Sequence, residues 1–204
     1  MTTKRLSTSA MVRTALLSAV ACVLMQIDLR LPIFPGFLGL DVSDVPAVIG
    51  AVTGGPLVGF TIVFLKNVMD MIIFGTSTGG IGNAANFVIG AALVVPVGIV
   101  YKRSRNNKGY FIGGAIGLVS MVIVACLANY FVLLPLYSRL FMPMETILEV
   151  ANAVNSNVTN VYSFLLFAIV PFNLLKGGLT IGLGFILYRA LRPALASIMT
   201  SDKI

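Results

Sequence analysis

The chain has 204 residues, of which 58% are hydrophobic and only 10% are charged. A soluble domain usually carries roughly 25% charged residues, so this composition excludes an ordinary solvated surface and predicts a single-domain integral membrane protein. The net charge of +7 does not indicate a nucleic-acid partner, because the basic residues fall at the ends of apolar runs and not on one amphipathic face.

Six apolar runs predict an all-α membrane domain over residues 1–204, because about 20 apolar residues cross the hydrocarbon core as a helix. No small-residue cleavage pattern follows the first run, which is therefore interpreted as a transmembrane helix and not a signal peptide. The predicted helices cover residues 10–29, 44–53, 56–74, 81–101, 109–137 and 158–190.

The second predicted helix is too short to span the membrane fully, and Asp44 is placed to cap its first turn. The loop before it, residues 31–44, is broken by Pro and Gly residues. Irregular backbone at membrane depth is tolerated where it is buried in protein or lines a cavity. The sequence therefore predicts an outward-facing cavity covered by this loop.

The distribution of charge predicts that both termini are cytoplasmic, since cytoplasmic segments of membrane proteins are enriched in Lys and Arg. With six crossings and an inner N-terminus, the inner segments contain ten of the fourteen basic residues: Lys4, Arg5, Arg13, Lys102, Arg103, Arg105, Lys108, Arg189, Arg192 and Lys203. Six of the seven acidic residues fall at or near outer ends: Asp28, Asp41, Asp44, Asp70, Glu145 and Glu149.

The strongest candidate site is the pair Asn173 and Lys176, three residues apart on one face of the last helix. A lysine at membrane depth costs about 2.5–3.5 kcal/mol, and long apolar flanks keep Lys176 from reaching water, so it needs an acceptor from the protein or from a ligand. The amide of an Asn offers two donors and an acceptor, which suit a heterocycle edge that alternates C=O and N–H.

Three further polar sets lie within predicted helices, and each has a structural alternative to ligand contact. Lys66 and Asp70, four residues apart, form either a self-neutralising pair or part of a cavity wall. Asn83 and Asn86 either cap a helix or reach a ligand. Asn129, next to Tyr130, is either a ligand contact or a hydrogen bond between helices.

Catalytic patterns are absent from the sequence, which contains no GxxxxGK[ST], GxSxG, HExxH or CxxC motif and no histidine. The chain is therefore not expected to be an enzyme, to bind a metal, or to hydrolyse ATP on its own. The polar segment 138–157 receives no assigned role.

The segments LDVSDVPAVIGAVTGGPLVGF (40–60) and KNVMDMIIFGTSTGGIGNAANF (66–87) resemble the S components of energy-coupling factor (ECF) vitamin transporters. ALLSA (15–19) is similar to the AxxxA pattern with which these proteins dock to a shared transmembrane subunit. NYFVLLPLY (129–137) and PFNLLKG (171–177) resemble the riboflavin-specific branch of the family.

This resemblance implies a six-helix subunit of a prokaryotic plasma membrane that captures riboflavin from outside. It also implies docking, through Ala15 and Ala19, to one transmembrane coupling subunit and two cytoplasmic ATPases. Riboflavin is then the transported ligand and no cofactor is expected. By analogy the ligand contacts are Asn129, Asn173, Lys176, Leu40, Asp44, Asn83, Asn86 and Tyr130.

Two alternatives to riboflavin capture stay open at this point. The same polar groups and aromatic residues would suit another heteroaromatic vitamin. The chain would also fit an accessory membrane subunit without a ligand, whose polar residues only hold its helices together.

Overall fold

The computed structural model describes residues 8–201, with side chains as far as Leu191. The predicted inner charges Lys4, Arg5 and Lys203 lie outside the described residues, as does the side chain of Arg192. Helices are the only regular elements in this part of the chain, apart from one isolated bridge between Leu29 and Leu40.

The predicted all-α membrane fold is confirmed. Five helical segments of the described chain are long and apolar enough to cross a membrane, and one shorter apolar helix accompanies them. The first four helices in chain order are α1 (Thr8–Met25), α2 (Val45–Gly54), α3 (Pro56–Ile73) and α4 (Ile81–Ser104). The remaining two membrane segments, 107–140 and 161–201, are each built from several consecutive helical elements.

Both of these longer segments contain a π-helical turn that the sequence analysis did not predict. The first consists of α5 (Asn107–Ala128), η1 (Asn129–Leu133) and α6 (Leu134–Leu140). The second consists of α8 (Val161–Phe164), η2 (Leu165–Ile169) and α9 (Val170–Ser201). Each π turn therefore interrupts a membrane segment that is otherwise α-helical.

A proline follows each π turn and accounts for its position. Before Pro135, the backbone N–H of Leu134 donates to the carbonyl of Asn129, five residues earlier. Before Pro171, the backbone N–H of Val170 donates in the same way to the carbonyl of Leu165. A proline ring clashes with the carbonyl four residues earlier and supplies no N–H, so widening the preceding turn relieves the clash. Proline alone is not sufficient, because Pro96 lies inside α4, which stays α-helical throughout.

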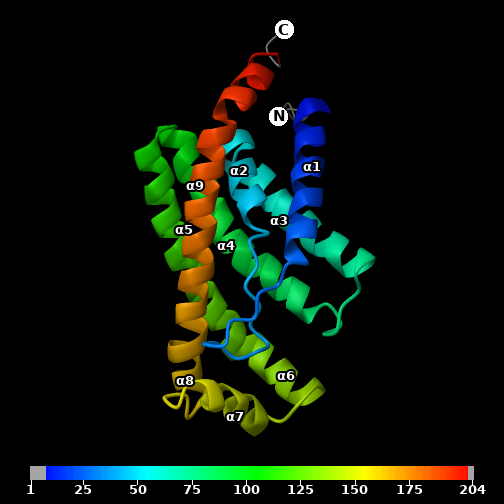
Figure 1. Cartoon of the computed structure of the whole chain (residues 1–204), viewed down its shortest axis with the longest axis vertical. Coiled ribbons are helices and arrows are strands. Elements are labelled where there is room, and N and C mark those ends of the chain that lie inside the picture. Colours follow the sequence, from blue (N-terminus) through cyan, green and yellow to red (C-terminus); the bar gives the residue numbers. More distant parts are fainter. Residues whose placement is uncertain (1–7, 202–204) are drawn as a thin grey trace, which may run out of the picture.

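One further helix, α7 (Met144–Val154), lies within the polar segment 138–157, for which the sequence analysis predicted no helix and no role. Its apolar residues Ile147 and Ala151 are buried, whereas Glu145 and Glu149 are exposed. In Figure 1 α7 lies across the end of the molecule opposite to the start of α1 and the end of α9. The segment is thus an amphipathic cap at one end of the bundle.

The helices pack closely where glycines allow backbones to approach. A Cβ added at Gly117 of α5 would lie 2.4 Å from the carbonyl oxygen of Leu93 on α4, and one added at Gly113 would lie 3.0 Å from Cα of Val97. These contacts leave no room for a side chain between α4 and α5, as expected for small residues at membrane helix interfaces.

The segment between α1 and α2 crosses the face of the bundle as an irregular loop (Figure 1). Leu29 and Leu40 exchange two backbone hydrogen bonds of 2.9 Å, which close the loop at its base. Phe34 is buried and meets the ring of Phe172 edge to face, with ring centroids 5.4 Å apart. The loop is therefore packed into the protein, which lets its backbone lie near membrane depth.

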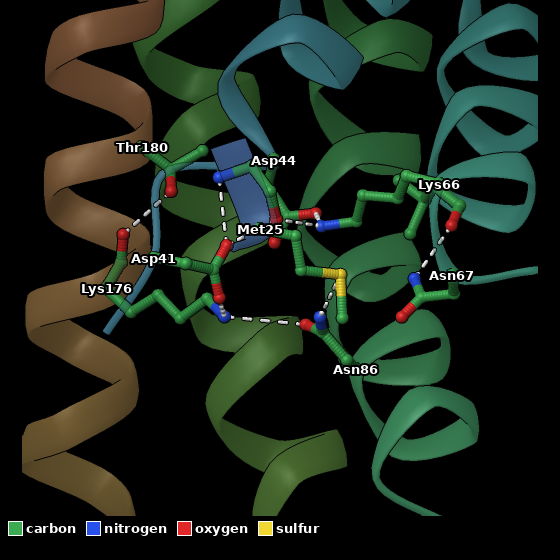
Figure 2. A network of polar contacts seen from close by, with 10 residues as sticks. Met25, Asp41, Asp44, Lys66, Asn67, Asn86, Lys176 and Thr180 are labelled. Atoms are coloured by element: carbon green, nitrogen blue, oxygen red, sulfur yellow. Dashed lines mark hydrogen bonds and ion pairs between the residues drawn. The ribbon is translucent and has the colours of Figure 1, made fainter. Parts of the chain in front are cut away.

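A buried ion pair fixes the end of this loop to α3. Nζ of Lys66 lies 2.6 Å from Oδ1 of Asp44, and both side chains are 0% exposed. The same ammonium donates to Oγ of Ser43 at 2.5 Å. The expected side-chain cap of α2 by Asp44 is therefore wrong. Of the two alternatives for Lys66 and Asp70, the self-neutralising pair is also wrong, because the partner of Lys66 is Asp44. The lysine reaches the start of α2 because its long side chain extends away from its own helix (Figure 2).

The Gly117 contact predicts a difference between two glycine substitutions. Gly117→Ala should lower the free energy of unfolding by about 1–3 kcal/mol, because the added methyl group meets the backbone of α4. Gly178→Ala is the matched control, since that glycine is also inside a helix but nothing lies within 4 Å of the added Cβ. Thermal unfolding of the detergent-solubilised variants measures the change, and equal stabilities would contradict the packing described.

The buried ion pair predicts a second effect on stability. Lys66→Met should destabilise the protein by about 3–5 kcal/mol, because it leaves the carboxylate of Asp44 buried without a counter-charge. Combining Lys66→Met with Asp44→Asn removes both charges and should recover most of that loss in the same unfolding assay. A double variant as unstable as Lys66→Met alone would show that the unpaired charge is not the cause.

Candidate ligand-binding cavity

A cavity of about 560 Å³ lies between the loop 26–44 and the helices, toward the end of the bundle where α7 lies. Its volume falls within the roughly 300–1,000 Å³ of small-molecule sites. Apolar side chains from the loop, η1, α7, α8 and α9 form much of its wall: Phe37, Leu133, Ile147, Phe164 and Phe172. A few polar groups converge among them, which is the usual composition of a binding pocket.

Lys176 of α9 is the cationic group of this cavity. Its Nζ lies 2.7 Å from Oδ2 of Asp41 in the loop and 3.4 Å from Oδ1 of Asn86 on α4 (Figure 2). Burial alone would raise the pKa of the Asp41 carboxyl, but the ammonium groups of Lys176 and Lys66 outweigh it and hold that pKa below its ordinary value. Asp41 is therefore ionised at neutral pH and neutralises the lysine that the apolar flanks isolate from water.

The two ion pairs of the protein's interior are joined through Ser43. Its hydroxyl donates to Oδ1 of Asp41 while accepting from Lys66, and its backbone amide donates to the same carboxylate oxygen at 2.9 Å. Four residues of one loop thus link Lys176 on α9 with Lys66 on α3 (Figure 2). Residues 41–44 are therefore fixed by an ion pair at each end, Asp41 with Lys176 and Asp44 with Lys66.

Asn129 and Asn173 present their side chains to the cavity from the two helices that contain π turns. Nδ2 of each donates to the carbonyl oxygen four residues earlier, Ala125 at 2.8 Å and Ile169 at 2.9 Å. No hydrogen bond of either amide oxygen is made to another residue within 8–191. These acceptors are available to a ligand, and π turns are frequent at functional sites because they redirect side chains.

A second polar group of the cavity wall comes from α3. Asp70 accepts from Nε2 of Gln26 at 2.5 Å and from Nδ2 of Asn83 at 2.6 Å. Asp70 and Gln26 line the cavity directly, whereas Asn83 lies behind them and is buried. This acid thus joins α1, α3 and α4 at the edge of the site.

The structure brings together four of the residues predicted as ligand contacts and places four others outside the cavity wall. Asn86, Asn129, Asn173 and Lys176 line it. Leu40 packs beside Phe34 and Phe172. Asp44 is enclosed with Lys66, Asn83 supports Asp70, and Tyr130 stacks on Tyr162 at a ring distance of 5.7 Å. The second group therefore supports the wall or lies away from it.

Asp41 and Gln26 are cavity residues that the sequence analysis did not select. Asp41 could have been found, because Lys176 needed an acidic partner and the loop supplies two acids within four residues. Gln26 follows the end of α1 and gives no comparable signal, since its role depends on where that helix ends relative to α3.

The residues predicted for docking lie on another surface. Ala15 and Ala19 are exposed on α1, next to the exposed Leu16 and Val20, and neither of them lines the cavity. This part of α1 presents a smooth apolar strip to its surroundings. The start of α1 lies at the same end of the bundle as the end of α9, opposite to α7 (Figure 1).

Comparison with known proteins gives consistent results over nearly the whole chain. Residues 9–188 match the family described as "ECF transporter, substrate-specific component". The chain is 35% identical to the riboflavin transporter RibU of Staphylococcus aureus over 190 residues, which cover 92% of this chain and 93% of that protein. It is 32% identical to the riboflavin transporter FmnP of Bacillus subtilis over 169 residues, 82% of this chain and 83% of the relative.

A solved structure described under "Structure and mechanism of the S component of a bacterial ECF transporter" has the same fold. It superimposes with a TM-score of 0.71 at 31% sequence identity, covering 91% of this chain and 96% of that one. Together with the five apolar spans, these matches describe a multi-pass protein of the bacterial plasma membrane. The chain belongs to the substrate-specific (S) components of ECF transporters, a family of transport subunits and not of enzymes.

Proposed function

We propose that this chain captures riboflavin in the cavity and delivers it inward as the substrate-binding subunit of an ECF transporter. The observation that supports this most directly is the convergence of Lys176, Asn173, Asn129 and Asn86 on one cavity with aromatic walls. The relatives that share over 30% of the sequence are named riboflavin transporters, which favours riboflavin over another heteroaromatic vitamin. Membership of the substrate-specific family disfavours a subunit without a ligand.

The polar groups of the cavity complement a flavin ring. The ammonium of Lys176 and the second N–H of each Asn side chain are donors for the ring carbonyls and the acceptor ring nitrogens. The amide oxygens of Asn129 and Asn173 are acceptors for the ring N–H. Phe37, Phe164 and Phe172 provide apolar surface against which an aromatic ring system packs.

The positions of the charged ends support the predicted orientation, with both termini in the cytoplasm. The start of α1, the end of α9 and the junction of α4 with α5 lie at the same end of the molecule (Figure 1). Lys102, Arg103, Arg105 and Lys108 are at that junction. By the positive-inside rule this end faces the cytoplasm, so the cavity under the loop and α7 faces outward.

Transport in this proposal requires a coupling module of one transmembrane subunit and two cytoplasmic ATPases, docked on the exposed strip of Ala15 and Ala19. The chain has no nucleotide-binding motif, so the energy must come from a partner. Small side chains on a lipid-facing helix allow a partner helix to approach closely.

Removing single polar groups of the cavity should weaken riboflavin binding. Asn129→Ala, Asn173→Ala and Lys176→Ala should each raise the dissociation constant roughly ten- to a hundredfold, because a ligand group is left without its partner in a buried site. Quenching of flavin fluorescence by the purified variants measures the affinity.

Leu174→Ala is the control for these variants. Leu174 is adjacent to Asn173 on α9 but is 46% exposed and lies outside the cavity wall, so its removal should leave the affinity unchanged. Unchanged affinity in all three polar variants would reject the assignment of the site.

Bulky residues on the docking strip should separate binding from transport. Ala15→Trp or Ala19→Trp should leave riboflavin affinity intact and abolish uptake into proteoliposomes that contain the coupling subunit, the ATPases and ATP, because the indole keeps the partner helix away. Ile123→Trp on the exposed face of α5 serves as the control and should transport normally.

Two results would contradict this part of the proposal. Loss of riboflavin binding in the Ala15 or Ala19 variant would show that this face of α1 belongs to the pocket and not to a docking surface. Accumulation of riboflavin by the chain alone, driven by a proton or sodium gradient, would make it a secondary transporter with no need of an ATPase.

A further inference from the structure

Asp70 is a cavity residue to which the flavin-ring contacts give no role. It is 9% exposed, it lines the cavity, and it comes from α3, whereas Asn173 and Lys176 come from α9. Figure 2 shows α9, with Lys176, and α3, with Lys66 and Asn67, on opposite sides of the network, with Asn86 of α4 between them. Asp70 follows Asn67 by one helical turn, so the cavity has two polar sides of different chemistry.

The chemistry of the Asp70 side is that of a hydrogen-bond acceptor. Within residues 8–191 no Lys or Arg forms an ion pair with Asp70. Its two oxygens accept one amide N–H each, from Gln26 at 2.5 Å and from Asn83 at 2.6 Å. A carboxylate has about four lone-pair positions, so roughly two acceptor positions remain after these bonds.

The two amides also fix the direction in which those acceptor positions point. Gln26 approaches one oxygen from the end of α1, and Asn83 approaches the other from α4. A carboxylate held from two sides has lost its rotational freedom before a ligand arrives, which reduces the entropic cost of binding. A buried carboxylate at membrane depth is costly unless its acceptor positions are used, so such residues are expected to have a functional role.

We propose that Asp70, oriented by Gln26 and Asn83, is the subsite that accepts hydrogen bonds from hydroxyl groups of the ligand's polyol chain. This inference rests on the proposed function, because riboflavin consists of a ring with carbonyl and N–H groups and a chain that presents hydroxyl groups. Hydroxyl donors match a fixed carboxylate, whereas ring carbonyls are repelled by it. Asp70 thereby sets the direction of the ligand, with the ring toward Lys176 and the chain toward α3.

Two flavins that differ only in this chain test the assignment. Lumiflavin has the same ring system with a methyl group in place of the polyol. Asp70→Asn, which keeps the size of the side chain, should weaken riboflavin binding roughly ten- to a hundredfold and change lumiflavin affinity by less than about twofold. Glu149→Gln makes the same chemical change at an exposed position of α7 and should alter neither affinity.

A measurable affinity for both ligands that is reduced by the same factor in Asp70→Asn would show that the acid only holds the helices together. Unchanged riboflavin affinity would show that Asp70 does not contact the polyol chain. If Asp70→Asn binds neither flavin, Gln26→Met decides: selective loss of riboflavin supports the subsite, and parallel loss of both overturns it. Failure of the unaltered protein to bind riboflavin at all would instead reject the proposed function itself.

Discussion

Two lysines lie inside a membrane-embedded bundle, and both counter-charges come from one short segment. Asp41 pairs with Lys176 on α9 and Asp44 pairs with Lys66 on α3, with Ser43 bonded to both systems. Removing one member of such a pair leaves a buried charge uncompensated, so the segment has little freedom to leave the bundle. The position at which α2 begins and the position of the cavity wall both depend on this arrangement.

The opposite wall depends on helix geometry and not on charge. The membrane segments 107–140 and 161–201 each widen into a π turn before a proline. Each presents one Asn to the cavity, Asn129 at the start of the first π turn and Asn173 about one turn after the second. The loop fixed by its acids and the two widened helices therefore enclose a space that is mostly apolar with a few oriented donors and acceptors. In a pocket of this composition a few side chains determine which ligand is bound.

Much of this architecture could be predicted from the sequence because a membrane imposes simple rules. Apolar length predicts the spans, and the charge of Lys176 within a long apolar run points to the region of the cavity that this residue lines. The partners could not be assigned in the same way. Asp70 is four residues from Lys66, but Lys66 pairs with Asp44 across the bundle. Helix α7 escaped prediction although its apolar residues Ile147 and Ala151 follow a helical period, because its polar residues are also typical of a loop. The π turns escaped prediction because one extra residue in a turn leaves no clear signal in the hydrophobic period.

The account depends most on the isolated chain being a flavin-binding protein, with energy supplied only by its partners. The most direct measurement is a titration of the purified chain with riboflavin, in detergent and without any coupling subunit or ATP. We expect saturable binding of one riboflavin per chain, quenched flavin fluorescence, and no comparable binding of vitamins whose rings lack the flavin's carbonyl and N–H edge. Absence of riboflavin binding, or equal binding of such unrelated vitamins, would contradict the account.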